Sequence, residues 1–402
     1  MKILQINKFY YLKGGAERHL FELSKLLESN GHTVIPFSMQ DPQNLPAPYA
    51  EYFAKPVGFD HFSLSGFFKF FHNWEAVRQL KRLLRDEKPD LAHLHNVAHQ
   101  LTPSIIRVLK QYGIPVVMTL HDYQPICPSY QLYVKGKYCE RCKGGKYYQC
   151  ALNRCVKNSR PKSLMSMLEL YLHRRIFKNY DLVDHFIAPS RFMAEVSAAF
   201  GLPQEKISVV YNFLGEGQRI ELEADADYPL GDYLLYFGRL SEEKGINDLL
   251  EAISGTSAKL KVVGAGPEHE SLQARSKALG LGRQTEFLGY QEGSELIRLI
   301  KQARAVVLPA RWPENMPYSL IEALAAGRPL LVSRIGGLTE LVNPGENGFT
   351  FAPGDPEDLR RAILKLEKAD FQAMSEASKE QGKRFDSGQF YQKISQIYES
   401  LI

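Results

Sequence analysis

Short apolar runs alternate with amphipathic segments along the first half of the chain. Several runs are rich in the branched aliphatic residues of buried strands: ILQINKF, HTVIPFSM, DLAHLHN, PVVMTLHD, HFIAPS and KISVVYN. Between the first two runs, Ala16, Leu20, Leu23 and Leu27 recur at helical spacing. Strands that alternate with helices form a parallel sheet with helices on both faces. We therefore predict a doubly wound, Rossmann-like α/β domain over residues 1–213.

The alternation stops at an acidic segment, residues 213–232, and then restarts. This segment is poor in periodic apolar positions, and we interpret it as a linker between domains. The strand-like runs that follow are YLLYFGRL, KLKVVGAG, TEFLGY, AVVLPA and PLLVSRI. They predict a second Rossmann-like domain over residues 229–384. A C-terminal helix, at about residues 385–402, is expected to pack back on the first domain.

Length and composition narrow the class of protein. A chain of 402 residues suits two domains, and 44% hydrophobic with 24% charged residues is typical of a globular protein. No run approaches the roughly 20 apolar residues of a membrane-spanning helix. The N-terminal apolar run is interrupted by Gln5 and Asn7, unlike a signal peptide. We expect a cytoplasmic protein.

One aromatic segment, SLSGFFKFFHNW, suggests contact with a membrane surface. Its apolar aromatic residues and one lysine are typical of a bilayer interface: Phe67, Phe68, Lys69, Phe70, Phe71 and Trp74. Lys81, Arg82 and Arg85 follow on the next predicted helix, and the chain has a net charge of +5. The alternative is a helix buried on the sheet. The charge is too small to indicate nucleic acid. We expect a membrane-borne acceptor at the inner face of the plasma membrane.

All five cysteines lie in an insert of the first domain, residues 127–155. In a chain without a secretory signal, such clustering favours a metal site over disulfides. Cys139 and Cys142 form a C-x₂-C pair, which is the usual first half of a structural zinc site. Cys150 and Cys155 are expected to complete it, with Cys127 as the alternative ligand. An iron–sulfur cluster and unliganded thiols remain open, and a zinc-ribbon nucleic-acid module would explain nothing in the rest of the chain.

Loops that follow predicted strands carry the candidate ligand-binding glycines. At the carboxyl ends of parallel strands, loops lead into helix N-termini with unpaired N–H groups. Gly14 and Gly15 precede the first helix, and Gly264 with Gly266 forms a second candidate phosphate-binding turn. Purely structural turns are the alternative. His269 stands where a dinucleotide fingerprint needs its third glycine, which disfavours a nicotinamide dehydrogenase.

Charged residues of the second domain indicate recognition of a phosphorylated sugar compound. Arg239 follows a buried strand and Lys244 lies near a helix start, so the two cations could neutralise a diphosphate. Glu314 and Glu322 flank a strand-to-helix junction at Pro317. Eight positions at about 100° per residue place the two carboxylates on related faces, where they could accept hydrogen bonds from hydroxyl groups.

The ordered motifs GGAER, TLHD, GRLSEEKG, VVGAGPE, FLGY, ENMPYSLIEALAAGRP and IGGLTELVNPGENGF resemble those of glycosyltransferase family 4, also described as glycosyl transferases group 1. These are retaining enzymes of GT-B fold, with two Rossmann-like domains that face each other across a cleft. The resemblance implies transfer of a hexose-like sugar from a UDP- or GDP-sugar to a lipid-linked or saccharide acceptor in cell-surface polysaccharide or glycolipid assembly. It implies no metal cofactor for catalysis. A catalytically silent nucleotide-sugar-binding scaffold is the alternative.

The same resemblance implies roles for individual residues. Arg239 and Lys244 would bind the donor diphosphate, Glu314 the transferred sugar, and Glu322 the ribose hydroxyls. His121 matches the histidine near the reacting sugar. Further donor contacts would come from Gly14, Gly15, Leu288, Asn315, Met316 and Pro317.

One departure from the family pattern lies between the two glutamates. Family members more commonly have a Gly-Phe-Gly run where this chain has Asn315, Met316 and Pro317. Pro317 lacks an amide N–H, so at least one backbone contact to the donor must differ. The departure leaves the reaction class intact and the donor sugar open.

Overall fold

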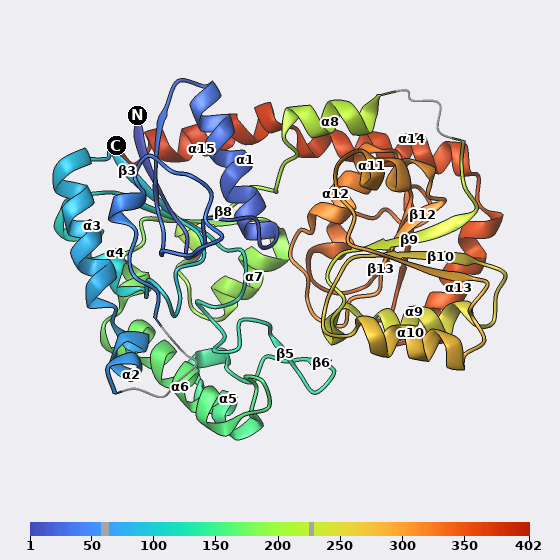
Figure 1. Cartoon of the computed structure of the whole chain (residues 1–402), viewed down its shortest axis with the longest axis horizontal. Coiled ribbons are helices and arrows are strands. Elements are labelled where there is room, and N and C mark those ends of the chain that lie inside the picture. Colours follow the sequence, from blue (N-terminus) through green and yellow to red (C-terminus); the bar gives the residue numbers. More distant parts are fainter. Residues whose placement is uncertain (58–63, 225–228) are drawn as a thin grey trace. The chain divides into compact units, whose positions relative to one another are not determined.

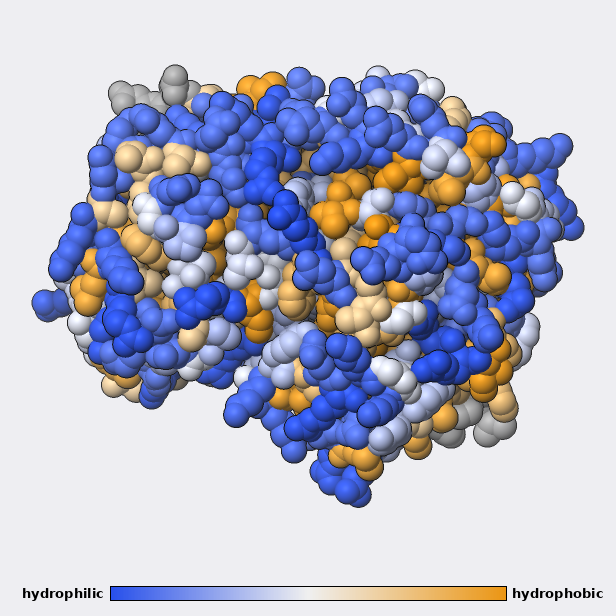
Figure 2. Space-filling model, turned by 180° about the vertical axis from the view of Figure 1, so that it is seen from behind, coloured by the Kyte–Doolittle hydropathy of each residue, from blue (hydrophilic) through white to orange (hydrophobic). Residues whose placement is uncertain are grey.

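The computed structural model describes residues 1–57, 64–224 and 229–402, with only the backbone of residues 64, 65 and 67 (Figure 1). One compact unit contains residues 1–134, 139–211 and 390–402, and the other contains residues 135–138 and 212–389. Within these ranges, no helix is both long and apolar enough to cross a bilayer. Figure 2 shows one face of the molecule, on which hydrophilic residues predominate and hydrophobic residues form small patches.

The first unit is built on a parallel sheet with the strand order β2-β1-β3-β4-β7-β8. Residue Leu4 of β1 pairs with Ile35 of β2 on one side and with Ala92 of β3 on the other. The strands are β1 (Lys2–Ile6), β2 (Thr33–Phe37), β3 (Leu91–Leu94), β4 (Val116–Thr119), β7 (His185–Ala188) and β8 (Ile207–Val209). Parallel neighbours require crossover connections, which here are helices and longer loops.

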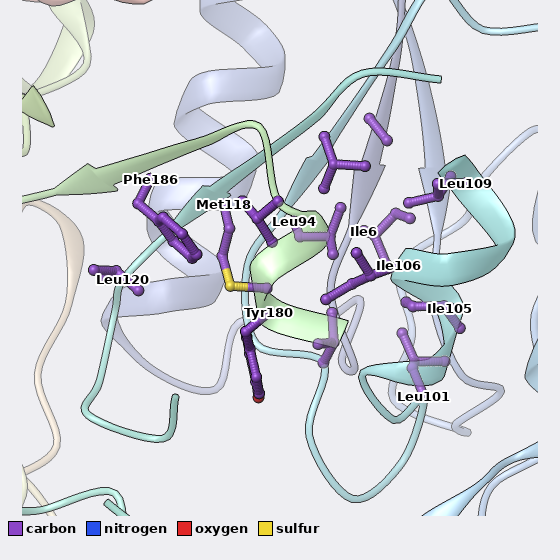
Figure 3. Close-up of a cluster of buried hydrophobic side chains, with 14 of the residues drawn as sticks. Ile6, Leu94, Leu101, Ile105, Ile106, Leu109, Met118, Leu120, Tyr180 and Phe186 are labelled. Carbon is purple, nitrogen blue, oxygen red and sulfur yellow. The ribbon is translucent and has the colours of Figure 1, made fainter. Parts of the chain in front are cut away.

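Helices cover this sheet and bury its central strands. They are α1 (Gly15–Ser29), α2 (Leu64–Phe71), α3 (Trp74–Glu87), α4 (Ser104–Gln111), α7 (Arg191–Ala199) and α15 (Ser387–Glu399). Figure 3 shows the core, in which Ile6, Leu94 and Met118 from three adjacent strands lie near Ile106 of α4 and Phe186 of β7. Strands buried on both faces have continuous apolar sequences, and this is why the strands were predictable.

The cysteine insert and the residues after it form a separate group of short elements in the first unit. These elements are β5 (Tyr133–Val134), α5 (Tyr148–Asn153), α6 (Arg160–Tyr171) and a π-helical turn (Leu172–Ile176), whereas β6 (Lys137–Tyr138) belongs to the other unit. His173 in the π-helical turn places Nε2 3.0 Å from the carbonyl oxygen of Phe71, which ties the turn to the end of α2.

The C-terminal helix α15 completes the core of the first unit. Tyr398 is fully buried, and its hydroxyl lies 2.6 Å from His93 Nδ1 on β3. Phe390 makes an edge contact with the ring of His19 on α1, with 5.6 Å between ring centroids. The helix expected at about residues 385–402 therefore packs within the unit formed by the first half of the chain.

The second unit contains another parallel sheet, with the strand order β11-β10-β9-β12-β13-β14. Its strands are β9 (Tyr233–Phe237), β10 (Lys259–Val263), β11 (Thr285–Gly289), β12 (Ala305–Leu308), β13 (Leu330–Ser333) and β14 (Gly348–Phe351). Its helices are α8 (Glu216–Glu223), α9 (Ile246–Ile253), α10 (His269–Ala278), α11 (Gly293–Gln302), α12 (Tyr318–Ala325), α13 (Pro356–Lys368) and α14 (Phe371–Gly382). Two doubly wound domains are thus present, as predicted.

The acidic segment that we interpreted as a linker contains helix α8, so this interpretation is wrong for its described part; residues 225–228 lie outside the described ranges. Leu222 is the buried residue of α8, whereas Ile220 is 58% exposed. Polar contacts hold the helix end, because Lys301 Nζ donates to the carbonyl oxygen of Ala224 at 2.6 Å. A helix with one buried leucine produces no apolar periodicity, and this is why the sequence pattern missed it.

Candidate active site

The candidate donor residues lie where the strand order of the second sheet reverses. Strands β9 and β12 are neighbours there, although β10 and β11 separate them in sequence. Loops at the carboxyl ends of such strand pairs are the usual ligand sites of open α/β sheets. The loop after β9 carries Arg239 and Lys244, and the loop after β12 carries Glu314. The topology therefore brings three residues that were predicted separately to one edge of one sheet.

Lys244 and Glu314 form an ion pair through Nζ and Oε1. The side chains are 19% and 8% exposed, so solvent screens the pair only weakly. Trp312 donates its indole N–H to the same Oε1 atom at 2.7 Å, and its ring centroid lies 5.6 Å from Lys244 Nζ. The cation predicted to bind phosphate and the carboxylate predicted to bind sugar are thus fixed against each other.

Arg239 is exposed at the start of its loop, and a hydrogen bond from the preceding strand holds its backbone. The Tyr236 hydroxyl donates to the carbonyl oxygen of Arg239 at 2.7 Å. Burial, together with the negative charges of Glu314 and Glu243, holds the pKa of Tyr236 well above its ordinary value. The hydroxyl therefore stays protonated and remains a donor, which fixes the backbone from which the guanidinium extends.

Glu322 lies inside helix α12 and is 2% exposed. Its Oε1 accepts a hydrogen bond from Gln218 Nε2 of α8 at 2.5 Å. Pro317 is the residue before α12, with φ −72°, as the proline position in the sequence predicted. Sequence reasoning missed Gln218, because its segment was interpreted as a linker.

The two glycines of VVGAGPE have a packing role. A Cβ atom on Gly264 would lie 1.9 Å from the carbonyl oxygen of Gly238, and one on Gly266 would lie 2.1 Å from that of Leu240. The loop after β10 therefore rests directly on the loop that carries Arg239. Contact with phosphate, the other predicted role of this turn, stays a prediction.

A glycine that sequence reasoning did not single out supports Glu314. Gly336 has φ +61°, and a Cβ atom there would lie 2.3 Å from the carbonyl oxygen of Glu314. The amide of Gly337 donates to the same oxygen at 2.8 Å. Its signal was present in the motif IGGLTELVNPGENGF, where paired glycines follow a predicted strand.

The remaining predicted donor contacts lie in the same unit. Met316 is 3% exposed, and its carbonyl oxygen accepts from Asn212 Nδ2 at 2.8 Å. Asn315 is half-buried beside it. Leu288 is half-buried near the end of β11, the edge strand of the sheet. Their contacts with a nucleotide sugar stay predictions.

In the first unit, the half-buried His121 joins three buried histidines in a cluster that the sequence analysis did not predict. His95 follows β3, His121 follows β4, and His19 lies on α1. His95 Nδ1 is 2.8 Å from His121 Nε2, and His95 Nε2 is 2.6 Å from Gln5 Oε1. His93 stacks on His95 with 4.5 Å between ring centroids. The signal was a histidine directly after each of two strands.

Burial keeps this cluster neutral. Desolvation lowers the pKa of His19 to about 3 and holds the pKa values of His93, His95 and His121 well below the ordinary value. Histidine, cysteine, aspartate and glutamate side chains can bind metal ions. Among the described residues, one group of three such side chains, His19, His95 and His121, has ligand atoms that all lie within 4.8 Å of one another. Three neutral imidazoles are a donor set that could hold a transition-metal ion.

A cavity of about 200 Å³ in the first unit adjoins His95 and His121. Lys8, His99 and Asp122 also line it, and burial raises the pKa of Asp122. Its charged and aromatic lining suits a small polar ligand.

The paired glycines at the start of α1 lie in the same unit as this cavity. Gly15 is the first residue of α1, and Gly14 precedes it in an extended conformation. A Cβ atom on Gly14 would make only an ordinary contact, at 3.7 Å from Glu17 Oε2. Close packing is therefore not the reason for a glycine at position 14. Contact between Gly14 and the donor phosphates stays a prediction.

All five cysteines are free thiols, and four of them gather in one place. Cys127, Cys142 and Cys150 are buried in the hydrophobic core of the first unit, and Cys155 packs against the same core. The Cys155 thiol and burial together raise the pKa of Cys150, and burial with the neighbouring thiols raises that of Cys142. Cys127, the alternative ligand of the sequence analysis, belongs to this group. Cys139 does not pack against this core, although its thiol also helps to raise the pKa of Cys142, and Cys139 and Cys155 are both half-buried.

The aromatic segment of α2 divides between core and surface. Phe70 is 7% exposed and stacks on His99, and Phe71 is half-buried. Phe68 and Trp74 are 53% and 55% exposed. The prediction that all these aromatic residues face a membrane is therefore wrong for Phe70; Ser63 and the side chain of Phe67 lie outside the described residues. On the next helix, Arg82 pairs with Glu51, so its charge is already partly neutralised.

Comparison with known proteins identifies the family. Residues 13–214 match the family model Glycosyltransferase Family 4, and residues 226–385 match Glycosyl transferases group 1. A glycogen synthase of Mycobacterium tuberculosis is 28% identical over 395 residues, covering 91% of this chain and 86% of that protein. The lipopolysaccharide 1,6-galactosyltransferase of Salmonella typhimurium is 30% identical over 194 residues, covering 46% and 53%.

A solved structure has a similar fold. HepE of Anabaena in complex with UDP superposes with a TM-score of 0.65 at 19% identity, covering all of both chains. This likeness and the two parallel six-stranded sheets confirm the predicted fold class. The chain is a GT-B enzyme that belongs to glycosyltransferase family 4.

Proposed function

We propose that this glycosyltransferase moves a hexose-like sugar, with retention of configuration, from a UDP- or GDP-sugar to an acceptor hydroxyl. The observation that carries the proposal is the Lys244–Glu314 ion pair at the reversal point of the second sheet, with Arg239 on the adjacent loop. Two relatives support the substrate class by name: HepE was solved with UDP, and the Salmonella protein acts in lipopolysaccharide synthesis. We infer a role in cell-surface polysaccharide or glycolipid assembly.

The proposed chemistry depends on electrostatic stabilisation of the leaving group. The bond between the anomeric carbon and the diphosphate oxygen breaks, and negative charge develops on that oxygen. Arg239 and Lys244 stabilise this charge, so no divalent metal is required. The acceptor oxygen bonds to the anomeric carbon on the same face, and its proton passes to the departing phosphate oxygen. Glu314 orients the sugar hydroxyls and Glu322 those of the ribose.

A nucleotide-release assay tests the proposal. Purified protein is incubated with UDP-, GDP- and ADP-sugars, with and without a lipid-linked or saccharide acceptor, in the presence of EDTA. Acceptor-dependent release of one nucleotide, and a product with the donor's anomeric configuration by NMR, would support retaining transfer. Binding of a donor without release under any acceptor would instead indicate the silent nucleotide-sugar-binding scaffold. Strict dependence on magnesium or manganese would contradict the metal-independent chemistry.

We further propose that the first unit contacts an anionic membrane surface, where a lipid-linked acceptor would be available. Leu164, Leu168 and Ile176 stand four and then eight residues apart along α6 and the π-helical turn, and they are 47%, 38% and 65% exposed. Exposed cations flank this stripe: Arg160, Lys162, Arg175 and Lys178. An exposed apolar stripe beside cations suits adsorption to anionic headgroups.

Vesicle flotation should reveal this contact. Binding should rise with anionic lipid and weaken in high salt, since each well-placed cation adds about 1 kcal/mol near an anionic surface. Ile176→Asp should reduce binding several-fold, because it places a negative charge in the exposed stripe. Ile220→Asp on α8 is the matched control, because Ile220 is also a 58% exposed isoleucine on a helix and lies in the other unit. Equal effects of both variants, or no binding by the wild type, would refute the proposed contact.

The cysteine insert is proposed to hold one structural zinc. Cys127, Cys142, Cys150 and Cys155 are the ligand set that the core placement supports, with Cys139 outside it. No three of these thiols meet the 4.8 Å spacing found among the described histidines, so binding would require them to draw together.

Metal analysis of purified protein should give about one zinc per chain, as a tetrahedral four-thiolate site requires. Cys142→Ser should lose the metal, and Cys139→Ser should keep it. Mercurial titration of the thiols should release the zinc from the wild type. A zinc content near zero in the wild type would exclude the site. Loss of zinc in Cys139→Ser would instead show that Cys139 is a ligand together with Cys142, as the C-x₂-C pair predicts.

A further inference from the structure

A second cavity in the first unit, of about 430 Å³, is bordered by the cysteine insert on one side and by the end of α7 on the other. Arg174, Arg175 and Lys178 line it, together with Asp181. Gly144 and Tyr147 of the insert and residues 198–201 complete the wall. Three cations therefore border a space with one carboxylate among them. Neither the proposed transfer chemistry nor the zinc site uses these residues.

Arg174 gives this cavity the character of a built anion site. Its side chain is only 7% exposed. Nη2 donates to the carbonyl oxygen of Gly201 at 2.9 Å, and Nη1 lies 3.5 Å from Asp181 Oδ1. Nε and Nη1 have no hydrogen-bond partner. Because a buried charged donor without a partner is costly, guanidinium groups in such places usually face an anion.

The surrounding backbone holds the cations in position. Arg175 Nη2 donates to the carbonyl oxygen of Gly144 at 3.0 Å. The next residue, Gly145, has φ +81°, and a Cβ atom there would lie 2.1 Å from Arg175 Nη2. A larger residue at position 145 would therefore push this guanidinium out of its present position. Lys178 adopts a left-handed backbone, φ +50°, at the edge of the cavity. Such a conformation is uncommon for residues other than glycine, and it starts the turn that carries Asp181.

We propose that this cavity binds a phosphate group, as a monoester or a diphosphate. An arginine presents a planar fork that matches two phosphate oxygens, and lysine adds a point charge. The phosphate could belong to a lipid headgroup or to a free phosphorylated compound. Ile176 and Phe177, 65% and 42% exposed, lie between Arg175 and Lys178 in the sequence, so a headgroup at a membrane surface could reach the same cations. The proposal does not depend on the transferase activity.

Calorimetric titration of the full chain with inorganic phosphate and pyrophosphate tests the site. The starting protein carries Arg239→Ala and Lys244→Ala, so that the two cations of the candidate donor site do not contribute to phosphate binding. Adding Arg174→Gln should weaken binding by about tenfold or more, since it removes a charge-assisted bidentate contact, and Arg174→Lys should restore part of it. Lys393→Gln is the matched control, because Lys393 is an exposed cation on α15 of the same unit and lies outside the cavity.

Vesicles distinguish the two sources of phosphate. The vesicles are made of phosphatidylcholine with phosphatidic acid. If the cavity binds a lipid headgroup, Arg174→Gln should abolish binding of the protein to these vesicles, and pyrophosphate should compete with the vesicles. If the cavity binds a free phosphorylated compound, Arg174→Gln should weaken phosphate binding in the calorimeter but leave vesicle binding unchanged. If Arg174→Gln fails to fold by circular dichroism, Arg175→Gln with Lys178→Gln, both exposed positions, replaces it. Unchanged affinity in the folded variants, or no binding to either phosphate or vesicles, overturns the proposal.

Discussion

Replacing Lys244 by alanine should slow sugar transfer by about 30- to 1,000-fold, equal to roughly 2 to 4 kcal/mol in the barrier. The ammonium group is proposed to stabilise charge that develops on the leaving diphosphate, and this charge is larger in the transition state than in the bound donor. The loss should therefore appear in kcat as well as in kcat/KM. Turnover measured by nucleotide release on a folded Lys244→Ala protein checks the expectation, and a rate near wild type would contradict it.

The same substitution should also lower stability, and the two effects can be separated. Without Lys244, the carboxylate of Glu314 is 8% exposed and loses its charged partner, which should cost roughly 1–3 kcal/mol in the free energy of unfolding. Adding Glu314→Gln removes the buried charge, so the double variant should regain stability but not activity. Lys259→Ala is the matched control, because Lys259 pairs with Asp232 at an exposed site and should change neither quantity measurably.

Acid should unfold the first unit before the second. His19, His93 and His95 are buried and His121 is half-buried, and desolvation lowers the pKa of each below the ordinary value of about 6.5. Below that pH, the unfolded chain binds protons that the folded unit excludes, so stability falls as pH falls. Each such histidine lowers the free energy of unfolding by up to about 1.4 kcal/mol per pH unit. Asp122, whose pKa burial raises, acts in the opposite direction, but one carboxyl group does not offset four imidazoles.

The two tryptophans allow each unit to be followed separately. Trp74 lies in the first unit and Trp312 in the second, so Trp312→Phe and Trp74→Phe leave one reporter each. Urea unfolding monitored by fluorescence should show a midpoint for the first unit that falls steeply between pH 7 and 5. The second unit, with His269 as its single histidine, should change much less. A midpoint of the first unit that does not change over this range would refute the prediction.

Most of the fold could be predicted because both sheets are parallel and buried on both faces. Runs such as VVM in β4 and AVVL in β12 are apolar throughout, and the helices between strands show clear spacing. Helix α8 was missed because Leu222 is its one buried residue and its other anchors are polar contacts. Phe68 and Phe70 could not be assigned to surface and core from sequence, because their neighbours in the aromatic run are equally apolar.

The candidate site could be predicted only as separate parts. Glu314, Glu322, Arg239 and Lys244 each stand in a motif after a strand or at a helix start. That Lys244 contacts Glu314, 70 residues away, follows from the adjacency of β9 and β12, which no local pattern encodes. The histidine cluster shows the same limit, because His19 joins His95 and His121 only through the packing of α1.

The position of Tyr398 separates the order of synthesis from the order of folding. The ribosome makes residues 1–211 before residues 212–389, yet the core of the first unit lacks the tyrosine that bonds His93 until residue 398 has been added. At about 5–20 residues per second, this leaves an interval of about 10–40 s in which the second unit can be completed and the first cannot. The domain whose translation begins first is therefore the last to reach its native state.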